Sequence, residues 1–248
     1  MPDIKVHASK DWTYKQSRFY PNVPKVPFRM MCLAPSGGGK TTAIVDICVR
    51  LFDGVFSNIW VFSPTCVVDT SWDVVRRYVQ NKLGRDPNMH FFEEFTEETL
   101  QGILDKSLKI TELARDKGVQ PQPSALVVLD DIADDVRITK RSKAVQTLAI
   151  RSRHAGLSVI FGLQKLRAVT PLIRINMSDI LVWRLKNAKE KEAISKEYSA
   201  VWGKDATDAL IDHTTKEPFS FLWINTRAKT PEETFWLRFE VMLRPRRI

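Results

Sequence analysis

Five short, mostly apolar runs stand out along the chain. They cover residues 28–33, 58–63, 125–131, 158–164 and 179–184. Runs of this length without regular polar alternation are typical of parallel strands that are buried on both faces of a sheet. They predict the central strands of an α/β domain.

Helical patterns separate these runs. Apolar positions recur at three- and four-residue spacing over residues 40–52, 71–83, 139–154 and a segment that Thr96 caps and that ends near Gly118. Residues 186–198 predict a charge-rich exposed helix, in which Glu192 and Lys196 are four residues apart. Strands that alternate with helices through short turns predict a mostly parallel sheet with helices on both faces. Ligands then bind beyond the carboxyl ends of the strands.

The two ends of the chain, and one weaker apolar run in its first half, follow other patterns. Residues 219–225 and 235–243 predict a β-hairpin at the end of the sheet, and a weaker apolar run at 89–95 predicts one more strand. The prolines at positions 21, 24 and 27 predict that residues 1–27 form an irregular arm that packs on the domain or contacts a neighbouring subunit. We therefore expect an arm over 1–27 and one domain over 28–248. Its core covers about 28–185, and C-terminal helices and the hairpin cover 186–248.

A glycine-rich loop joins the first predicted strand to the first predicted helix. It reads Ala34-Pro35-Ser36-Gly37-Gly38-Gly39-Lys40-Thr41. Consecutive glycines let backbone N–H groups surround an anion, and the helix N-terminus adds partial positive charge. Lys40 can reach the outer phosphates of a nucleotide, and Thr41 can bind Mg²⁺. The pattern predicts a nucleoside triphosphate site made by Ser36, Gly37, Gly38, Gly39, Lys40, Thr41 and Thr42.

One position of this loop departs from the usual G-x-x-x-x-G-K-[ST] pattern. Ala34 stands where the first glycine is expected. Alanine fits there if the residue does not need a positive φ. The alternative interpretation is an ordinary glycine turn followed by a lysine.

Polar residues end two of the predicted strands. Asp130 and Asp131 end the third run, and Gln164 ends the fourth. In the predicted sheet these side chains meet the glycine loop at the ligand edge. We expect Asp130 to hold Mg²⁺ through water, Asp131 to orient the attacking water, and Gln164 to sense the γ-phosphate or that water. Such residues also end strands simply because turns begin there, and that alternative stays open.

Composition narrows the range of partners and compartments. The chain of 248 residues carries 38 basic and 29 acidic residues, a net charge of +9, which favours polyanionic partners such as nucleic acid. A basic surface without a partner is the alternative. Three widely spaced cysteines in apolar segments predict reduced core residues in a cytosol-like compartment. No apolar run is long enough to predict a membrane span or a secretion signal.

Residues 151–164 add a resemblance to a known family. They read Arg-Ser-Arg-His-Ala-Gly-Leu-Ser-Val-Ile-Phe-Gly-Leu-Gln and closely resemble the Arg-His, strand, Gln segment of FtsK/HerA-clade DNA translocases, specifically the poxvirus-type genome-packaging ATPases. Phe28-Arg29-Met30, Asp130-Asp131 and residues 172–179 resemble further segments of that branch. The resemblance covers about Pro27 to Trp183. Ala34 and Gly39 depart from its commoner loop variants.

The resemblance implies a RecA/FtsK-like P-loop NTPase that forms a homo-oligomeric ring. Such a motor hydrolyses ATP with Mg²⁺ and moves double-stranded DNA into a preformed capsid. An arginine of one subunit then reaches the γ-phosphate in its neighbour, and Arg151 and Arg153 are the candidates. In the competing interpretation they form salt bridges or contact DNA, together with Lys140, Arg141 and Lys143.

Further partners follow from the same resemblance. DNA contacts are expected on phosphates and not on bases, because a packaging motor must accept any sequence. Residues 244–247 (Arg-Pro-Arg-Arg) are expected to join the DNA surface, to dock on capsid proteins or to stay a charged tail. The expected location is a virus assembly site in an infected cell, or the virion itself.

Three other functions remain as alternatives. One is a cellular or plasmid DNA translocase or helicase of the same clade. Another is a P-loop kinase for nucleosides or small molecules, and a third is a nucleotide switch without hydrolysis. The segment 151–164 argues against a kinase, and Asp131 argues against a switch.

Overall fold

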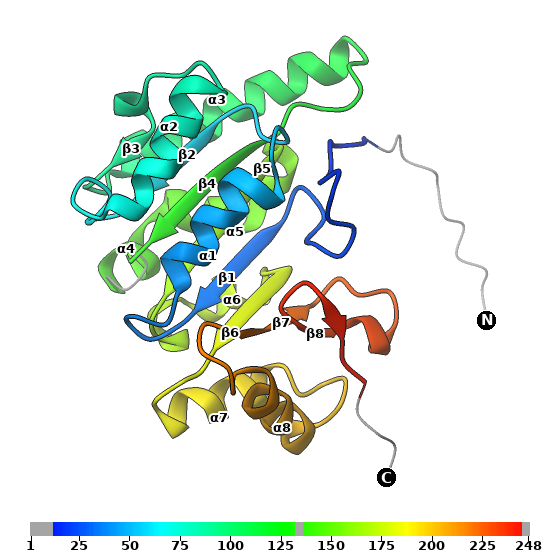
Figure 1. Cartoon of the computed structure of the whole chain (residues 1–248). Coiled ribbons are helices and arrows are strands. Elements are labelled where there is room, and N and C mark those ends of the chain that lie inside the picture. The colour runs from blue at the N-terminus through cyan, green and yellow to red at the C-terminus, as the bar shows by residue number, and fades with distance from the viewer. Residues whose placement is uncertain (1–11, 132–135, 245–248) are drawn as a thin grey trace, which may run out of the picture.

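The computed structural model of the chain describes residues 12–131 and 136–244. Within these ranges the strands form one nine-stranded sheet in the order β3-β2-β4-β5-β1-β6-β7-β8-β9 (Figure 1). The strands are β1 (Arg29–Leu33), β2 (Ile59–Phe62), β3 (Phe91–Phe92), β4 (Ala125–Asp130), β5 (Leu157–Leu163), β6 (Asp179–Trp183), β7 (Phe221–Asn225), β8 (Phe235–Leu237) and β9 (Val241–Met242). Neighbours from β3 to β6 are parallel, and neighbours from β6 to β9 are antiparallel. This confirms the predicted parallel sheet and C-terminal hairpin.

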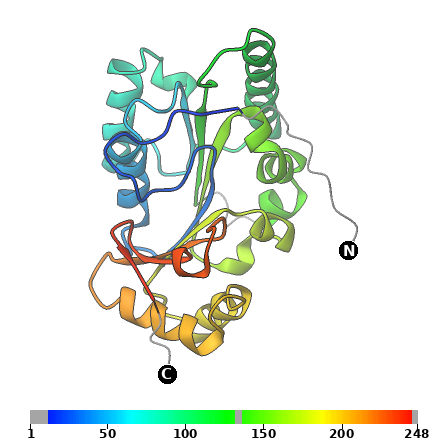
Figure 2. The ribbon, with the colours of Figure 1, turned by 90° about the vertical axis from the view of Figure 1, so that its right-hand side faces the viewer.

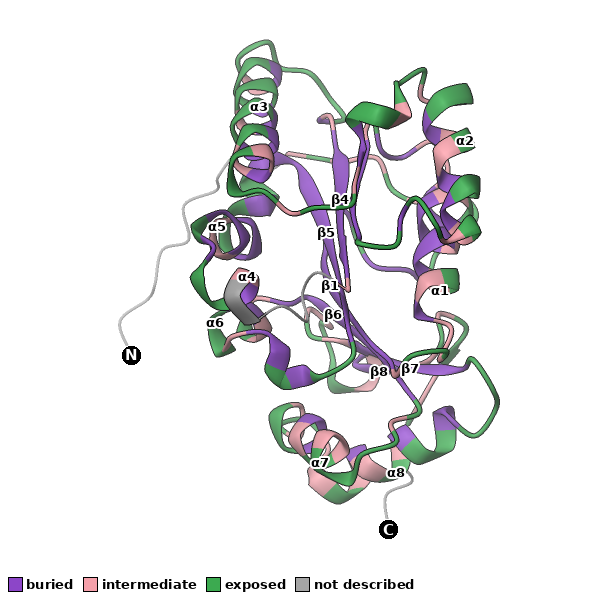
Figure 3. Cartoon of the chain, turned by 90° about the vertical axis from the view of Figure 1, so that its left-hand side faces the viewer, coloured by how far each residue is buried: buried purple, intermediate pink, exposed green. Residues whose placement is uncertain are grey.

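Helices cover both faces of the sheet. They are α1 (Lys40–Asp46), α2 (Asp73–Asn81), α3 (Glu97–Asp116), α4 (Val136–Arg141), α5 (Lys143–Arg151), α6 (Pro171–Ile175), α7 (Ala188–Glu197) and α8 (Lys204–Thr214). A π-helical turn, Ile47–Leu51, continues α1. Figure 2 shows the sheet between two layers of helices, and Figure 3 shows that its central strands are buried.

The alternation of side chains along each strand divides the core into two layers. Met30 and Cys32 of β1 belong to the layer under α1 and α2, whereas Met31 and Leu33 face α3, α5 and the C-terminal helices. Because both faces are covered, the central strands are buried throughout. Burial on both faces explains why these strands read as apolar runs without polar residues at every second position.

Three predicted elements differ from the structure. The single helix expected over 139–154 is two helices, because Ser142 starts α5 anew by accepting a hydrogen bond from the backbone N–H of Val145 (3.0 Å). The strand expected over 89–95 is only Phe91–Phe92. The strand expected over 235–243 is interrupted after Leu237, where Arg238 adopts a φ of 54°.

Two helices, α6 and α8, were not located from the sequence. Both α6 and α8 carry few buried apolar side chains, so their periodicity is weak. The start of α6 had a usable signal, since Thr170 caps it and Pro171 occupies its first position.

The described part of the N-terminal arm packs against the domain. Val23 and Val26 are buried in the core, Gln16 exchanges hydrogen bonds with the backbone of Val26, and Tyr14 forms a bridge with Gln122. Residues 1–11 of the arm and residues 245–248 of the basic tail lie outside the described residues.

Two further expectations concern the described chain as a whole. Cys32, Cys48 and Cys66 are free and buried, and burial raises the pKa of each thiol. Among the described helices, none combines the length and the apolar character that crossing a membrane requires.

Candidate active site

The glycine loop lies at the carboxyl edge of the parallel strands. Ala34 still pairs with β5, since its N–H donates to the carbonyl of Leu163 (3.1 Å), and it keeps a negative φ. Gly37 and Gly39 have φ values of 74° and 92°, which favour glycine. α1 begins directly afterwards at Lys40. The loop therefore surrounds the N-terminus of a helix, and alanine is tolerated at position 34.

The loop borders a hollow of about 540 Å³. Its lining includes the predicted residues Ser36, Gly37, Gly38, Gly39, Lys40, Thr41, Thr42, Asp131 and Gln164. The structure thus brings the loop, the second acid and the glutamine to one place. Residues from beyond β2 complete one side, namely Thr65, Val68, Asp69 and Ser71, and Phe219 completes another. Sequence reasoning missed these five residues, because strand order and not local pattern brings them there.

The ammonium group of Lys40 lies between the two acids. Its Nζ is 2.6 Å from Oδ1 of Asp130 and 2.5 Å from Oδ1 of Asp131. The Thr41 hydroxyl donates to Oδ2 of Asp130 at 3.3 Å. Lys40 and Asp130 are buried, whereas Asp131 is 33% exposed. One positive and two negative groups therefore share a site with little solvent.

The pKa shifts of this cluster follow from burial and charge. Burial raises the pKa of Asp130, although Lys40 opposes the shift. Burial alone would lower the pKa of Lys40, but Asp130 and Asp131 outweigh it and the net shift is upward. Lys40 therefore stays a cation, and its side chain is held close to where phosphates would bind.

Asp131 has a special backbone conformation. Its φ is 58°, a left-handed value that is unusual for a residue with a side chain, and it accepts a bond from Lys40. Strain of this kind persists where the surrounding structure enforces it, and it is common at functional sites. The conformation turns Asp131 into the hollow while Asp130 stays underneath.

Gly162 makes room for the cluster. It is the partner of Asp130 in the pairing of β4 with β5, directly below the lysine. Sequence reasoning gave it no role. The available signal was a glycine inside a strongly apolar strand, which often marks the close approach of another group.

Arg151 and Arg153 do not lie at the hollow of their own chain. They precede β5, whereas Gln164 follows it. A strand of seven residues is about 23 Å long, so the two arginines stand at the opposite edge of the sheet. Both side chains are exposed. From this position neither can reach the glycine loop of its own chain.

A buried arginine holds the segment that carries them. The guanidinium of Arg29 donates to the carbonyls of Ala149 (3.0 Å) and Ile150 (3.2 Å) at the end of α5. Burial, together with repulsion from Arg153 and Arg227, lowers the pKa of Arg29 to about 10. Arg29 thus caps the C-terminal end of α5, where Arg151 and Arg153 lie.

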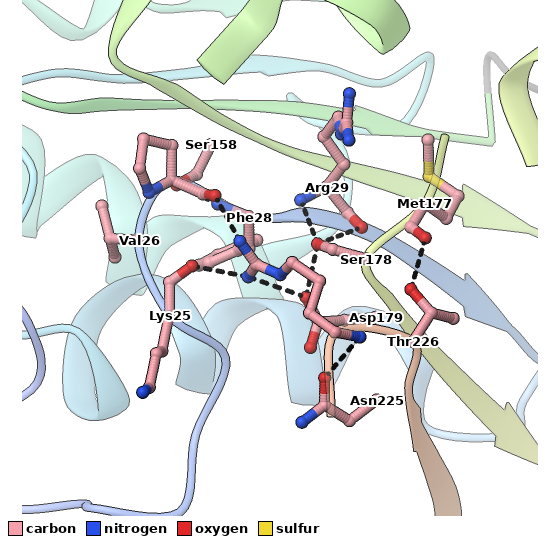
Figure 4. A network of polar contacts seen from close by, with 12 residues as sticks. Lys25, Val26, Phe28, Arg29, Ser158, Met177, Ser178, Asp179, Asn225 and Thr226 are labelled. Carbon is pink, nitrogen blue, oxygen red and sulfur yellow. Dashed lines mark hydrogen bonds and ion pairs between the residues drawn. The ribbon is translucent and has the colours of Figure 1, made fainter. Parts of the chain in front are cut away.

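A network of polar contacts at this edge surrounds Asp179 (Figure 4). Its carboxylate accepts bonds from the Ser178 hydroxyl (2.6 Å) and Trp223 Nε1 (3.0 Å), and it lies 3.5 Å from Arg227. Arg227 also donates to the carbonyls of Pro27 and Lys25 in the arm. The network ties the arm, β6 and the hairpin together.

The basic residues of α4 and α5 are spread out and do not form one cluster. Lys140, Arg141 and Lys143 lie around the start of α5 and are exposed. Arg151 lies eight residues further, about 12 Å along the helix. The basic neighbourhood expected from the sequence is therefore a strip that runs from one edge of the sheet toward the other.

The oxygen ligands at the cluster suit Mg²⁺. The Thr41 hydroxyl and the Asp130 carboxylate lie side by side, and hard oxygen donors are the ligands that this ion prefers. Thr41 would bind it directly, and Asp130 would hold it through water.

The parallel sheet, the glycine loop and the acids at its carboxyl edge together define a P-loop fold. The chain belongs to the Poxvirus A32 protein family, which matches residues 16–207. It is 30% identical over 150 residues to the uncharacterized protein 075L of Invertebrate iridescent virus 6, covering 60% of this chain and 55% of that protein. The chain spans 55% and 56% of the lengths of the curated relatives it matches.

Solved structures share the fold at low sequence identity. The genome packaging NTPase B204 from Sulfolobus turreted icosahedral virus 2, in complex with ATP-gammaS, has a TM-score of 0.56 at 15% identity over 87% of this chain and 98% of that one. The pCW3 conjugation coupling protein TcpA, in its monomer form with ATPgS, has a TM-score of 0.56 at 16% identity over 82% of this chain and 58% of that one.

Proposed function

We propose that this protein is the ATPase of a viral DNA-packaging motor, which hydrolyses ATP to move double-stranded DNA into a preformed capsid. The observation that carries the proposal is the cluster of Lys40, Thr41, Asp130 and Asp131 at the end of the glycine loop. Membership of the Poxvirus A32 protein family supports it. The fold shared with B204, a genome packaging NTPase, adds support.

The cluster suggests how binding and hydrolysis are coupled. In the structure, Lys40 is paired with both acids. Phosphates on the glycine loop compete for the ammonium group, and Lys40 turns toward them. Asp131 is then free to orient a water molecule for in-line attack on the γ-phosphate, and Gln164 contacts that water or the phosphate. Thr41 and, through water, Asp130 would hold Mg²⁺, which would neutralise charge that develops on the phosphates.

The arginine segment completes the site in a ring. Because Arg151 and Arg153 lie at the opposite edge of the sheet from the hollow, a head-to-tail arrangement of subunits carries them to a neighbour's nucleotide. Arg153 or Arg151 then stabilises the charge of the transition state. Arginine fingers of this kind accelerate hydrolysis on the order of a thousandfold or more.

Two arguments support DNA as the partner, namely the net charge of the chain and the need of a packaging motor to accept any DNA sequence. A net charge of +9 suits a polyanion, and the exposed side chains of Lys140, Arg141 and Lys143 offer phosphate contacts. Such contacts carry no sequence information, as a packaging motor requires. We propose that the motor works at a virus assembly site with capsid proteins as further partners, and membership of the Poxvirus A32 protein family supports this.

A second candidate is a DNA translocase outside packaging. The fold shared with the conjugation coupling protein TcpA favours it. Both candidates predict ATP hydrolysis that depends on duplex DNA, and they differ in whether a capsid receives the DNA.

Phosphate release from ATP, measured with increasing duplex DNA of several unrelated sequences, tests the proposal. We expect every sequence to stimulate turnover and the stimulation to weaken with salt, because phosphate contacts release counterions. Turnover that ignores DNA while phosphate moves to a nucleoside would indicate a kinase. Binding of ATP without any turnover would indicate a switch.

A further inference from the structure

One exposed aromatic residue lies directly on the glycine loop. Phe219 precedes β7, and its side chain is 69% exposed. Its ring is so close to Gly39 that a Cβ added there would meet Phe219 Cδ1 at 2.9 Å. Nothing in the proposed hydrolysis uses this ring.

The backbone holds Phe219 in a strained conformation. Its φ is 62°, a left-handed value that is rare for a bulky residue. The carbonyl of Phe219 accepts a bond from Trp183 Nε1 (3.2 Å), and Trp183 is buried. A large apolar side chain is thus fixed toward solvent at a cost in strain, which is common where a ligand is bound.

Phe219 separates two hollows that share the glycine loop. On one side lies the hollow of Lys40, Asp131 and Gln164. On the other lies a hollow of about 310 Å³ whose lining includes Gly37, Gly38, Trp183, Arg184, Thr215 and Pro218. Both include Phe219, so a ligand on the loop can extend from the first into the second.

The strand order gives the direction in which a nucleotide lies. β1, which leads into the loop, stands between β5 and β6. The acids and Gln164 end β4 and β5, so the γ-phosphate points to that side. The nucleoside then points to the side of β6 and β7, where Arg184 follows β6 and Phe219 precedes β7 at the same edge. This is the side of the second hollow.

We propose that Phe219 is the base platform of the nucleotide site, and that the purine stacks on its ring over the hollow between the glycine loop and residues 215–220. This inference rests on the proposed function, because it assigns the nucleoside end of the same nucleotide. Stacking on an aromatic face accepts any base. The platform therefore supplies affinity for a nucleoside and little discrimination between ATP and GTP.

Calorimetric titration with ADP and with inorganic pyrophosphate tests the platform, because the two ligands share the phosphates and only one has a base. Phe219→Ala and Phe219→Gly remove the ring, and glycine also accepts the left-handed backbone. Both variants should raise the Kd for ADP about tenfold or more and leave the Kd for pyrophosphate unchanged. Phe219→Trp should keep the ADP affinity within a few-fold. Phe19→Ala is the matched control, since Phe19 is 77% exposed and lines neither hollow.

The possible failures are distinguishable. If the Kd values for ADP and for pyrophosphate rise together, the ring shapes the glycine loop and is not a base platform. If the wild type binds both ligands and Phe219→Gly changes neither the Kd for ADP nor the Kd for pyrophosphate, the base lies elsewhere. That result would contradict the platform and leave the proposed function intact. A wild-type protein that binds neither ligand would contradict the proposed function itself. Thermal unfolding of each variant checks that the fold is kept.

Discussion

Gly162 faces Asp130 across β4 and β5, and a Cβ at position 162 would lie 2.0 Å from Asp130 Oδ1 and 3.1 Å from Lys40 Nζ. Gly162→Ala must therefore displace the acid that anchors the lysine. We predict that ATP turnover falls at least tenfold and that overpacking lowers the free energy of unfolding by about 1–3 kcal/mol. Phosphate release and urea unfolding measure the two effects.

Gly102→Ala is the matched control for this substitution. Gly102 lies on the exposed side of α3, and an added Cβ meets nothing within 4 Å. Alanine should leave turnover unchanged and stabilise the helix by up to about 1 kcal/mol. Equal turnover in both alanine variants would show that the space at Gly162 is not needed.

Lys40→Ala removes the cation that is shared by the acids and the phosphates. We predict loss of ATP turnover with the fold retained, because Asp130, whose pKa burial already raises, can take up a proton when its partner is gone. Circular dichroism and phosphate release check the two parts. Lys82→Ala is the control, since it breaks an exposed ion pair with Asp53 and a contact with the Tyr78 ring, away from the glycine loop, and should cost about 1 kcal/mol. Persistent hydrolysis in Lys40→Ala would mean that the loop has another role.

Arg153 acts on a neighbouring subunit in the proposed ring. Arg153→Ala subunits keep an intact loop, and Lys40→Ala subunits keep an intact arginine. A mixture of the two should regain part of the activity that each lacks alone, because some interfaces then combine both intact parts. Phosphate release across mixing ratios measures this. If mixed rings form and activity stays absent, Arg153 serves DNA binding or packing.

The buried carboxyl group of Asp179 makes the free energy of unfolding depend on pH, and its pKa shift gives the direction. Burial raises its pKa above 3.8, although Arg227, Ser178 and Trp223 oppose the shift. The folded protein then holds the proton more tightly than the unfolded chain, so this contribution to stability falls as pH rises from about 4 through the raised pKa. We compare the free energy of unfolding of the wild type with that of Asp179→Asn. The wild-type value minus the variant value should decline over this pH range, by at most about 1.4 kcal/mol per pH unit, and then level off.

Urea unfolding at a series of pH values measures this difference. The same change at exposed Asp116 controls for the substitution itself. A difference that grows with rising pH would show that the Arg227 ion pair outweighs burial.

The glycine loop and the paired acids could be predicted from the sequence because each is a contiguous motif at the end of an apolar strand. The central sheet followed from the same runs, since strands buried on both faces carry no polar alternation. Gly162 and Phe219 could not be given roles in this way. The first acts through the register of β4 with β5, and the second through the position of β7 beside β6.

The segment 151–164 shows how a contiguous resemblance separates in space. Its arginines and Gln164 belong to one motif, yet β5 carries them to opposite edges of the sheet. In the proposed ring, this strand would have a nucleotide at one end and a neighbouring subunit's nucleotide at the other. That assignment needs the direction of the strand, which the motif alone does not contain.

Movement along DNA is the central claim, and displacement of a triplex tests it most directly. A third-strand oligonucleotide is bound to a linear duplex, and its release is followed with the wild-type protein and with Lys40→Ala. We predict ATP-dependent release by the wild type on duplexes of unrelated sequence and none by Lys40→Ala. A triplex that stays in place while the wild-type protein consumes ATP at a DNA-stimulated rate would contradict a motor.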